Sequence, residues 1–238
     1  MNVSAVDEEW LGKIAFAPMI ALFCGRGGLA FKHQTVAHKV IVGLSGARSS
    51  GLSQSPDASV VVPAGALHGF DARGRDVVIA YLDSRHFSLH EAKALATKWE
   101  RMNAGSASMD CLREDIDALA PRSLPDRVSR SVAALLDHAT IPAAARSVGL
   151  SESRFSHVIS ETLGASPQVW RRWLRLRHAV DLVANGLSVT HAAYDAGFSD
   201  SAHFSRTCAN ALGIRPSAFK AGNLSFMRSE EPCDLALI

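Results

Sequence analysis

Two stretches of the C-terminal half share one arrangement of small, apolar and polar residues. The first covers residues 144–155 (AARSVGLSESRF) and the second covers residues 192–204 (AAYDAGFSDSAHF). Gly149 and Gly197, the glycines of the two copies, are 48 residues apart. A helix of small residues, a glycine turn and a second helix make a helix-turn-helix, whose second helix enters the major groove of DNA. The repeat therefore predicts two units that contact two stretches of the same groove.

The second helix of each unit should bury one face and turn the other toward the bases. The outward side chains expected from the helical repeat are Glu152, Ser153, Ser156, His157, Ser160, Ser201, Ala202, Ser205, Arg206 and Asn210. Arg206 can donate two hydrogen bonds to guanine, and His157 can donate one to a purine edge. Ala202 can contact a thymine methyl group. Glu152 either accepts from a cytosine amino group or stabilises the positive end of its own helix.

One long helix should connect the two units, because Pro167 suits a first turn and Asn185-Gly186 suits a helix end. Its roughly 17 residues span roughly 25 Å, which places the two recognition helices near one DNA turn apart, roughly 34 Å. This helix carries four arginines: Arg171, Arg172, Arg175 and Arg177. They either form a solvated or salt-bridged face or contact phosphates, and we take Arg171 and Arg172 as the candidate phosphate contacts.

The first 85 residues are expected to form β structure, because short runs rich in Val and Ile alternate with Gly, Pro, Ser and Asp. The predicted strands are Met19–Cys24, Val36–Leu44, Ser59–Val62 and Asp76–Leu82. We interpret the apolar stretch Ile14–Cys24 as one buried strand, and residues 43–58 as a loop around at most one weak strand. Regular short strands of this kind predict a small barrel or sandwich.

Helical periodicity begins after Ser88. The first helix should bury a face made of Leu89, Ala92, Leu95, Ala96 and Trp99, and another helix is predicted over residues 108–119. These two helices either cover the sheet or pair with a second copy of the chain. Pro121 and Pro125 mark the expected domain boundary. Later helix starts are predicted from caps and prolines at Asp126, Pro142, Ser151, Ser188 and Pro216.

Charge and cysteine content narrow the class of protein. Residues 126–229 carry 12 Lys and Arg against 7 Asp and Glu, and all but one of the cations are arginine, which suits forked contacts with phosphate and guanine. The cysteines, Cys24, Cys111, Cys208 and Cys233, form no C-x-x-C pair, which argues against structural zinc and favours a reducing cytosol. The longest apolar stretch is too short to span a bilayer, so we expect no membrane partner. Together with the cysteine pattern, this predicts a cytoplasmic protein.

Both units carry longer motifs than the repeat alone. The second has A-x-x-x-G-F-S-D-x-x-H-F-S-R from Ala193 to Arg206, then G-I-R-P-S-A-F from Gly213. The first has A-x-x-x-G-L-S-x-x-R-F-S from Ala145, then G-x-S-P from Gly164. On these motifs, residues 126–222 resemble the DNA-binding domain of the AraC/XylS family of bacterial transcription regulators. The resemblance covers about two-fifths of the chain and implies binding to double-stranded DNA.

The chain departs from the family pattern at a few positions. Cys208 stands where the family usually has Phe, and Trp170 stands where Tyr is common; we expect Trp170 and Trp173 in the core. His157 and Ser160 occur where Arg or Lys often follows the apolar position of the first recognition helix. These departures bear on the DNA sequence that is bound. The same module occurs in an alkylation-response protein with a cysteine-rich repair segment, and the scattered cysteines here argue against that function.

The segment P-x-G-x-x-H, from Pro63 to His68, resembles a motif of cupin barrels, and sensor domains of the AraC family often contain a cupin-like barrel. Three interpretations of His68 stay open. It packs at a barrel turn, or it lines an organic-effector pocket, or it belongs to a metal site. The pocket would contain His38, His68, Phe70 and Tyr81, and the metal site would contain His33, His38 and His68.

Together these observations predict an α+β chain with two domains: a cupin-like sensor or dimerisation barrel with trailing helices at 1–122 and a double helix-turn-helix domain at 123–225, before a tail at 226–238. The expected function is effector-responsive transcription regulation without a cofactor. RNA polymerase, an unidentified small molecule and a second copy of the chain are candidate partners. Two alternatives remain: a metal-dependent cupin enzyme with an accessory DNA-binding domain, and a ligand-independent regulator whose barrel only dimerises.

Overall fold

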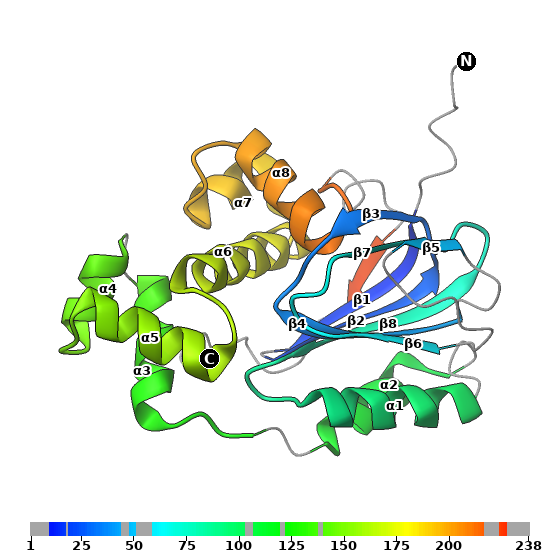
Figure 1. Cartoon of the computed structure of the whole chain (residues 1–238). Helices are drawn as coiled ribbons and strands as arrows, with labels where there is room; N and C mark the ends of the chain where they lie inside the picture. The colour runs from blue at the N-terminus through cyan, green and yellow to red at the C-terminus, as the bar shows by residue number, and fades with distance from the viewer. Residues whose placement is uncertain are drawn as a thin grey trace.

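The computed structural model describes residues 10–17, 19–43, 48–50, 59–102, 107–119, 122–137, 140–216 and 224–227. Its N-terminal part contains two β-sheets and two helices, and its C-terminal part is helical apart from one short strand (Figure 1). The predicted combination of a β-rich first half with a helical second half is therefore confirmed. Within the described residues, no helix is both long enough and apolar enough to cross a membrane.

The larger sheet has six strands. In spatial order they are β6 (Ser59–Val62), β4 (Ala37–Val42), β8 (Asp76–Asp83), β2 (Ile20–Arg26), β1 (Leu11–Ala17) and β9 (Leu224–Met227). The smaller sheet contains β3 (Leu29–His33), β7 (His68–Asp71) and β5 (Arg48–Ser50). The smaller sheet lies over one face of the larger sheet, and two helices lie under the other face (Figure 1).

The predicted strands correspond to β2, β4, β6 and β8, but the interpretation of Ile14–Cys24 as one strand is wrong. The chain reverses between Ala17 and Ile20, so that β1 and β2 pair antiparallel along their whole length. Both strands contribute apolar side chains to the same interior, and the sequence therefore stays apolar across the reversal. The weak strand expected within residues 43–58 is β5, whereas β1, β3 and β7 were not predicted as separate strands.

Helices α1 (Leu89–Arg101) and α2 (Met109–Asp117) cover the outer face of the larger sheet. Ser88 and Glu91 form a capping box at the start of α1, which satisfies backbone N–H groups of the first turn. The apolar stripes of both helices pack against Val40, Val42 and other sheet residues in one core, and Trp99 is fully buried there. These two helices therefore use their apolar stripes to cover the sheet.

The helical half contains α3 (Asp126–Asp137), α4 (Ile141–Ser147), α5 (Glu152–Leu163), α6 (Pro167–Ala184), α7 (Val189–Asp195) and α8 (Ser201–Leu212). The predicted starts at Asp126, Pro142 and Pro167 are confirmed, and so are the caps Ser151 and Ser188, whose side chains accept backbone hydrogen bonds. The helix expected after Pro216 lies outside the described residues. Local capping signals therefore set most boundaries in this half.

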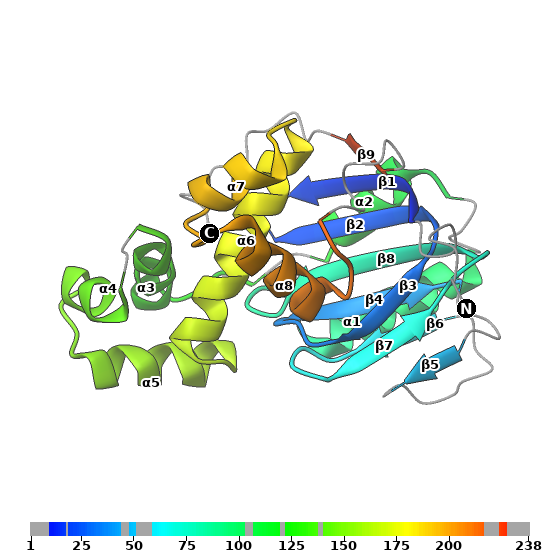
Figure 2. The same ribbon diagram turned by 90° about the horizontal axis from the view of Figure 1, so that it is seen from above.

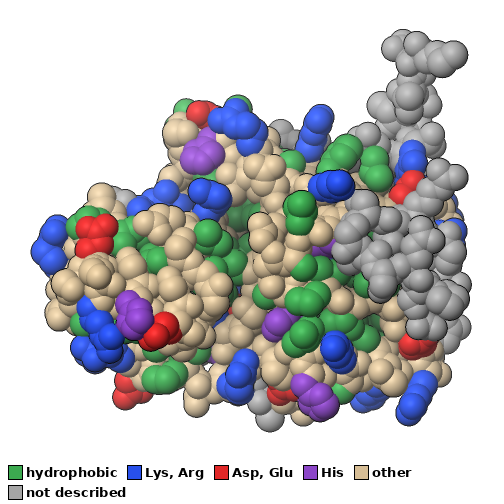
Figure 3. All heavy atoms as spheres, in the orientation of Figure 1, with side chains coloured by type: hydrophobic (Ala, Val, Ile, Leu, Met, Phe, Trp, Pro, Cys, Tyr) green, Lys and Arg blue, Asp and Glu red, His purple; other side chains and the backbone are tan. Residues whose placement is uncertain are grey.

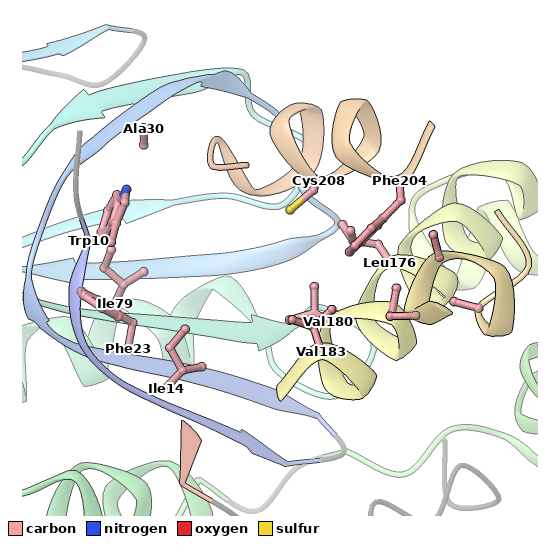
Figure 4. Packing of buried hydrophobic residues seen from close by; sticks show 14 of the residues in the cluster. Trp10, Ile14, Phe23, Ala30, Ile79, Leu176, Val180, Val183, Phe204 and Cys208 are labelled. Atoms are coloured by element: carbon pink, nitrogen blue, oxygen red, sulfur yellow. The ribbon is translucent and has the colours of Figure 1, made fainter. Parts of the chain in front are cut away.

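The two helix-turn-helix units differ in what they pack against. The first unit and the first half of α6 form a core nearly of their own, in which Phe155 and Trp170 are fully buried. The second unit shares one continuous core with the space between the two sheets. Val180 and Cys208 from the helices join Trp10 from the sheet side in that core (Figure 4). The second unit is thus packed directly on the N-terminal part, as the view from above also shows (Figure 2).

After the second unit, the chain returns to the larger sheet. Strand β9 pairs in parallel with β1, so that Gly12 lies opposite Leu224 and Ala15 lies opposite Met227. Parallel neighbours need a long crossover connection, and the whole helical half lies within that connection. The boundary expected between residues 225 and 226 falls inside this strand.

Candidate DNA interface and interior cavity

The first helix-turn-helix consists of α4 and α5. Thr140 caps α4, and the Ser151 side chain accepts a hydrogen bond from the backbone N–H of Arg154 at 3.2 Å. Along α5, Phe155, Ile159 and Leu163 recur every four residues and are buried. This stripe fixes α5 on the rest of the unit and leaves the opposite face of the helix in solvent.

The outward residues expected on α5 lie largely where they were predicted: Glu152, Ser153, His157 and Ser160 are exposed, and Ser156 is half-buried. His157 Nε2 lies 3.0 Å from Glu161 Oε2 one turn further along the helix. Arg154 is also exposed, although we did not predict it as a DNA contact. It is the only Lys or Arg on α5, and that fact could have singled it out in the sequence.

The second unit repeats this geometry with α7 and α8. Asp200 caps α8 by accepting from the backbone N–H of His203 at 2.6 Å. Phe204, Thr207 and Cys208 are buried under the helix, whereas Ala202, Arg206 and Asn210 are exposed and lie at four-residue spacing. One face of α8 is therefore exposed along two turns.

The two serines predicted on α8 contribute less to this face. Ser201 and Ser205 are half-buried, and the Ser205 hydroxyl donates to the backbone carbonyl of Ser201 at 2.8 Å. That bond uses the only proton of the Ser205 hydroxyl, so Ser205 can serve DNA only as an acceptor in this arrangement. Arg206 is the only Lys or Arg on α8 and has the donors for a forked contact.

Helix α6 joins the two units. Its 18 residues span about 27 Å at 1.5 Å per residue, close to the expected length. Trp170 is fully buried as predicted, while Trp173 is only partly buried and contacts the cores of both units. Arg172 is exposed and Arg171 is half-buried. On the face of the helical half that Figure 3 shows, basic side chains are interspersed with polar and acidic ones.

A buried ion pair connects the end of β8 to α6. Arg85 Nε lies 2.9 Å from both carboxylate oxygens of Asp83, and both side chains are almost fully buried. Burial raises the pKa of Asp83, but the charge and hydrogen bonds of Arg85 outweigh it and hold the pKa below its usual value. The Arg85 guanidinium also lies over the ring of Trp170, 5.0 Å from its centroid. This contact positions the first unit relative to the sheets.

An apolar cavity of about 90 Å³ lies between the larger sheet and helices α6 and α8. Trp10, Phe23 and Tyr81 line it from the sheet side, and Trp173, Leu176 and Val180 line it from α6. Asp83 and Arg177 add charged groups to the wall. The indole N–H of Trp10 is buried and has no hydrogen-bond partner among the described residues, so it is a free donor beside the cavity.

Two of the four residues expected in an effector pocket line this cavity, namely Phe70 and Tyr81. His68 does not line it, because its ring is fully buried against Lys39. His38 also lies apart from the cavity, where its Nδ1 accepts a hydrogen bond from the backbone N–H of Ala64 at 3.0 Å. Most of the cavity wall could not be grouped from the sequence, since its residues come from distant strands and from α6.

Lys39, which was not predicted as a functional residue, is fully buried between two histidines. Its Nζ lies 2.5 Å from His33 Nε2 and 2.9 Å from His68 Nε2. The Nδ1 atoms of the two rings lie 2.6 Å from the carbonyl of Phe31 and 3.0 Å from that of Ala66. Each Nδ1 can therefore donate to a carbonyl while Nε2 accepts from the lysine.

The environment keeps both histidines neutral. Burial, and after it the charge of Lys39, lowers the pKa of His33 to about 2 and that of His68 to about 4. Burial also lowers the pKa of Lys39 well below its ordinary value. The ammonium lies 4.6 Å from the ring centroid of Tyr81, whose π-face offsets part of the desolvation cost.

The structure does not gather His33, His38 and His68 into the metal site that was considered from the sequence. The Nζ atom of Lys39 lies between the Nε2 atoms of His33 and His68. In the part of the chain that the structure describes, no group of three or more His, Cys, Asp or Glu side chains is placed to hold a metal ion.

Two helix-turn-helix units joined by one rigid helix, each with an exposed face on its second helix, define a DNA-binding module with two recognition elements. Comparison with known families agrees, since residues 144–222 match the family described as "Helix-turn-helix domain". Residues 144–222 therefore match a helix-turn-helix domain of the AraC type.

Two curated relatives each match about two-fifths of the chain. The chain is 35% identical over 86 residues to the arabinose operon regulatory protein of Salmonella typhimurium, which covers 36% of this chain and 31% of that protein. It is 31% identical over 98 residues to the bifunctional transcriptional activator/DNA repair enzyme Ada of Escherichia coli, covering 40% of this chain and 28% of Ada. The chain thus spans about a third of the length of these relatives.

Two solved structures resemble most of the chain. The apo form of a single-residue variant of ToxT from Vibrio cholerae aligns over 84% of this chain and 95% of its own, with a TM-score of 0.52 and 9% identity. ToxT bound to (E)-4-(8-methylnaphthalen-1-yl)but-3-enoic acid aligns over 86% of this chain and 99% of its own, with a TM-score of 0.51 and 11% identity. At this identity the likeness is one of fold alone: the arrangement of a β-rich N-terminal part and a helical C-terminal part is shared with ToxT.

Proposed function

We propose that this chain is a sequence-specific DNA-binding transcription regulator of a bacterium that responds to an effector through its N-terminal part. The observation that carries this proposal is the pair of exposed faces on α5 and α8, which belong to two helix-turn-helix units joined by α6. The relatives named above are a regulatory protein and a transcriptional activator, which supports the same function. A regulator of bacterial promoters would act in the cytoplasm.

For the domains, we propose a cupin-like sensor barrel at 1–122 and a DNA-binding domain at 123–225. The two facing sheets and the P-x-G-x-x-H segment support the barrel. The sensor would also include β9, because residues 224–227 return to its larger sheet. In the sequence, the second helix-turn-helix would then be flanked on both sides by segments of the sensor, with β9 as the segment that follows it.

For DNA, we propose that α5 and α8 occupy adjacent segments of the major groove. The base-facing groups would be those predicted from the sequence: Glu152, Ser153, Ser156, His157, Ser160, Ser201, Ala202, Ser205, Arg206 and Asn210. Arg154 joins this set because it is exposed on α5. Arg171 and Arg172 on α6 would contact phosphates, which adds affinity without sequence preference.

For the effector, we propose a small and mainly apolar molecule bound in the cavity between the sheets and α6. Aromatic walls favour such a ligand. The indole N–H of Trp10, which has no partner among the residues that the structure describes, would donate to one polar atom on it. ToxT, which has the same fold, is described with a bound aromatic carboxylic acid. Binding can regulate DNA affinity only if the molecule prefers one of two arrangements of the chain.

Selection of genomic fragments by the purified full chain, followed by affinity measurements, tests this function. We expect a defined fragment to bind at least about 1,000-fold more tightly than scrambled DNA, as specific sites do. Equal affinity for both would refute the proposal. No specific observation favours a metal-dependent enzyme, and stoichiometric metal in the purified protein that is lost in His68→Ala would be the finding that supports one.

A further inference from the structure

The C-terminal end of α8 is bonded to an edge strand of the sensor. The backbone N–H of Phe31 donates to the carbonyl of Gly213 at 3.1 Å, and the N–H of Gln34 donates to the carbonyl of Asn210 at 3.1 Å. The last carbonyls of a helix have no partner within the helix. Strand β3 and the residue after it supply these partners, and we call this pair of bonds the β3–α8 joint.

His33 lies directly beneath the joint. A Cβ atom built on Gly213 would lie 2.5 Å from His33 Nδ1 and 3.0 Å from the carbonyl oxygen of Phe31, which shows how closely the helix end approaches the ring. The same Nδ1 lies 2.6 Å from the Phe31 carbonyl. The orientation of the His33 ring is therefore tied to the residue that makes the joint.

Lys39 connects this ring to the cavity. It bridges His33 and His68 on one side, and its ammonium faces the ring of Tyr81 on the other. Tyr81 lines the cavity, whereas Lys39 does not. A continuous series of contacts thus runs from the cavity wall through Tyr81, Lys39 and His33 to the end of α8.

The first unit lacks an equivalent connection among the described residues. Gly164 follows α5 as Gly213 follows α8, with φ angles of +70° and +76°. A Cβ built on Gly164 would have no neighbour within 4 Å in the part of the chain that the structure describes. Within that part, the sensor therefore contacts the end of only one recognition helix in this way.

We propose that Lys39 is a positioning residue that couples the cavity wall at Tyr81 to the β3–α8 joint and so sets the placement of the second recognition helix. A ligand that shifts the Tyr81 ring would change the contacts of Lys39 and His33, and the joint would hold α8 less firmly. This inference goes beyond the proposed function by naming the element that the sensor acts on. The inference rests on the proposed function only for the DNA-affinity measurements, and the amide-exchange measurements test it independently.

The test uses the full chain with Lys39→Met, which keeps an unbranched side chain, one atom shorter, but removes its donors. Amide hydrogen exchange at Phe31 and Gln34 should accelerate about tenfold or more, because these amides make the joint. Exchange along α5 should not change. Affinity for a fragment with both groove segments should fall about tenfold, while affinity for a fragment with only the first segment stays the same.

Ile41→Ala is the matched control, since Ile41 lies two residues from Lys39 on the same strand and is fully buried in the interior core. Both variants should lower the melting temperature, but only Lys39→Met should accelerate exchange at the joint beyond what the loss of stability explains. If exchange at Phe31 and Gln34 is the same in both variants, Lys39 is only a packing residue and the inference is wrong.

A second variant covers the case in which Lys39→Met does not fold. Tyr81→Leu removes the aromatic face but leaves the lysine and both histidines in place, and we expect faster exchange at Phe31 and Gln34 here as well. Unchanged exchange would overturn the connection to the cavity. If the wild-type chain binds no DNA, the proposed function fails, while the exchange comparison still decides whether Lys39 holds the joint.

Discussion

Replacing Gly213 or Gly164 with alanine compares two backbone positions that differ mainly in their contact with the sensor. Both glycines adopt a left-handed conformation after a recognition helix, with φ angles of +76° and +70°. An L-residue in this conformation costs about 1–2 kcal/mol, and this cost is common to both variants. The difference in unfolding free energy between the two variants therefore measures the contribution of the β3–α8 joint.

The added cost at Gly213 follows from the geometry. The new methyl group would lie 2.5 Å from a ring nitrogen of His33 and 3.0 Å from a backbone oxygen, both closer than van der Waals contact allows. Crowding of this kind costs about 1–3 kcal/mol. If the joint opens instead, two backbone hydrogen bonds are lost at about 1 kcal/mol each. Gly213→Ala should therefore destabilise the chain by about 1–3 kcal/mol more than Gly164→Ala.

Urea unfolding followed by tryptophan fluorescence measures this difference, and amide exchange locates it. Faster exchange should be confined to Phe31, Gln34 and the last turn of α8 in Gly213→Ala, and to the end of α5 in Gly164→Ala. Equal losses of unfolding free energy in the two variants, with the Phe31 and Gln34 amides equally protected, would refute the reasoning. In that case the close approach of His33 to α8 would make no difference to the free energy of unfolding.

Three further predictions concern DNA binding and pH. Arg206→Ala should weaken binding to the selected fragment by about 1–3 kcal/mol and relax discrimination at one base pair, so wild-type affinity and selectivity in a competition assay would contradict it. Arg172→Ala should weaken binding to all sequences alike and reduce the slope of log K against log salt by about 1; an unchanged slope argues against a phosphate contact. Stability should fall between pH 7 and pH 5, because the pKa values of His33 and His68, about 2 and about 4, lie below the unfolded value of about 6.5. The unfolded chain then takes up protons that the folded chain does not, at a cost of at most about 2 kcal/mol per histidine, and an unfolding free energy that is the same at both pH values would contradict this.

The helical half was predictable because its signals are local. Ser151 and Ser188 are caps, Pro167 begins a helix, and each of them acts on residues within one turn. The four-residue spacing of Phe155, Ile159 and Leu163 also identifies the buried face of α5 without knowledge of the rest of the fold. The outward face follows by exclusion, and most of the predicted residues on α5 are indeed exposed.

The interior of the N-terminal part was not predictable in the same way. Lys39 lies in an apolar run, and nothing in its neighbours shows that two histidines from other strands would meet it. The motif around His68 suggested a ligand or metal site, but whether His68 can bind either depends on which side chain lies beside its ring. In the structure that side chain is Lys39. The return of β9 to β1 is equally non-local, since more than 200 residues separate Ile14 from its partner Phe226. Pairing over such a separation is decided by the tertiary fold.

These non-local contacts bear on DNA binding, because the second unit shares one core with the two sheets. The first unit contacts the N-terminal part through the Arg85–Trp170 stack and through Val36, which joins its core, whereas the second unit shares the core between the two sheets. A change inside the sensor should therefore move the second recognition helix relative to the first. Since α6 connects both units, such a movement would alter the spacing at which the two helices can enter one groove.

Hydroxyl-radical footprinting of the full chain on its selected fragment tests most directly whether both units engage DNA together. We predict two protected segments on one face of the duplex, centred about one helical turn, or roughly 10 base pairs, apart. Arg206→Ala should weaken protection of one segment and spare the other. Protection of only one segment by the wild-type chain, or of none at moderate salt, would contradict the proposal that α5 and α8 bind adjacent segments of the major groove.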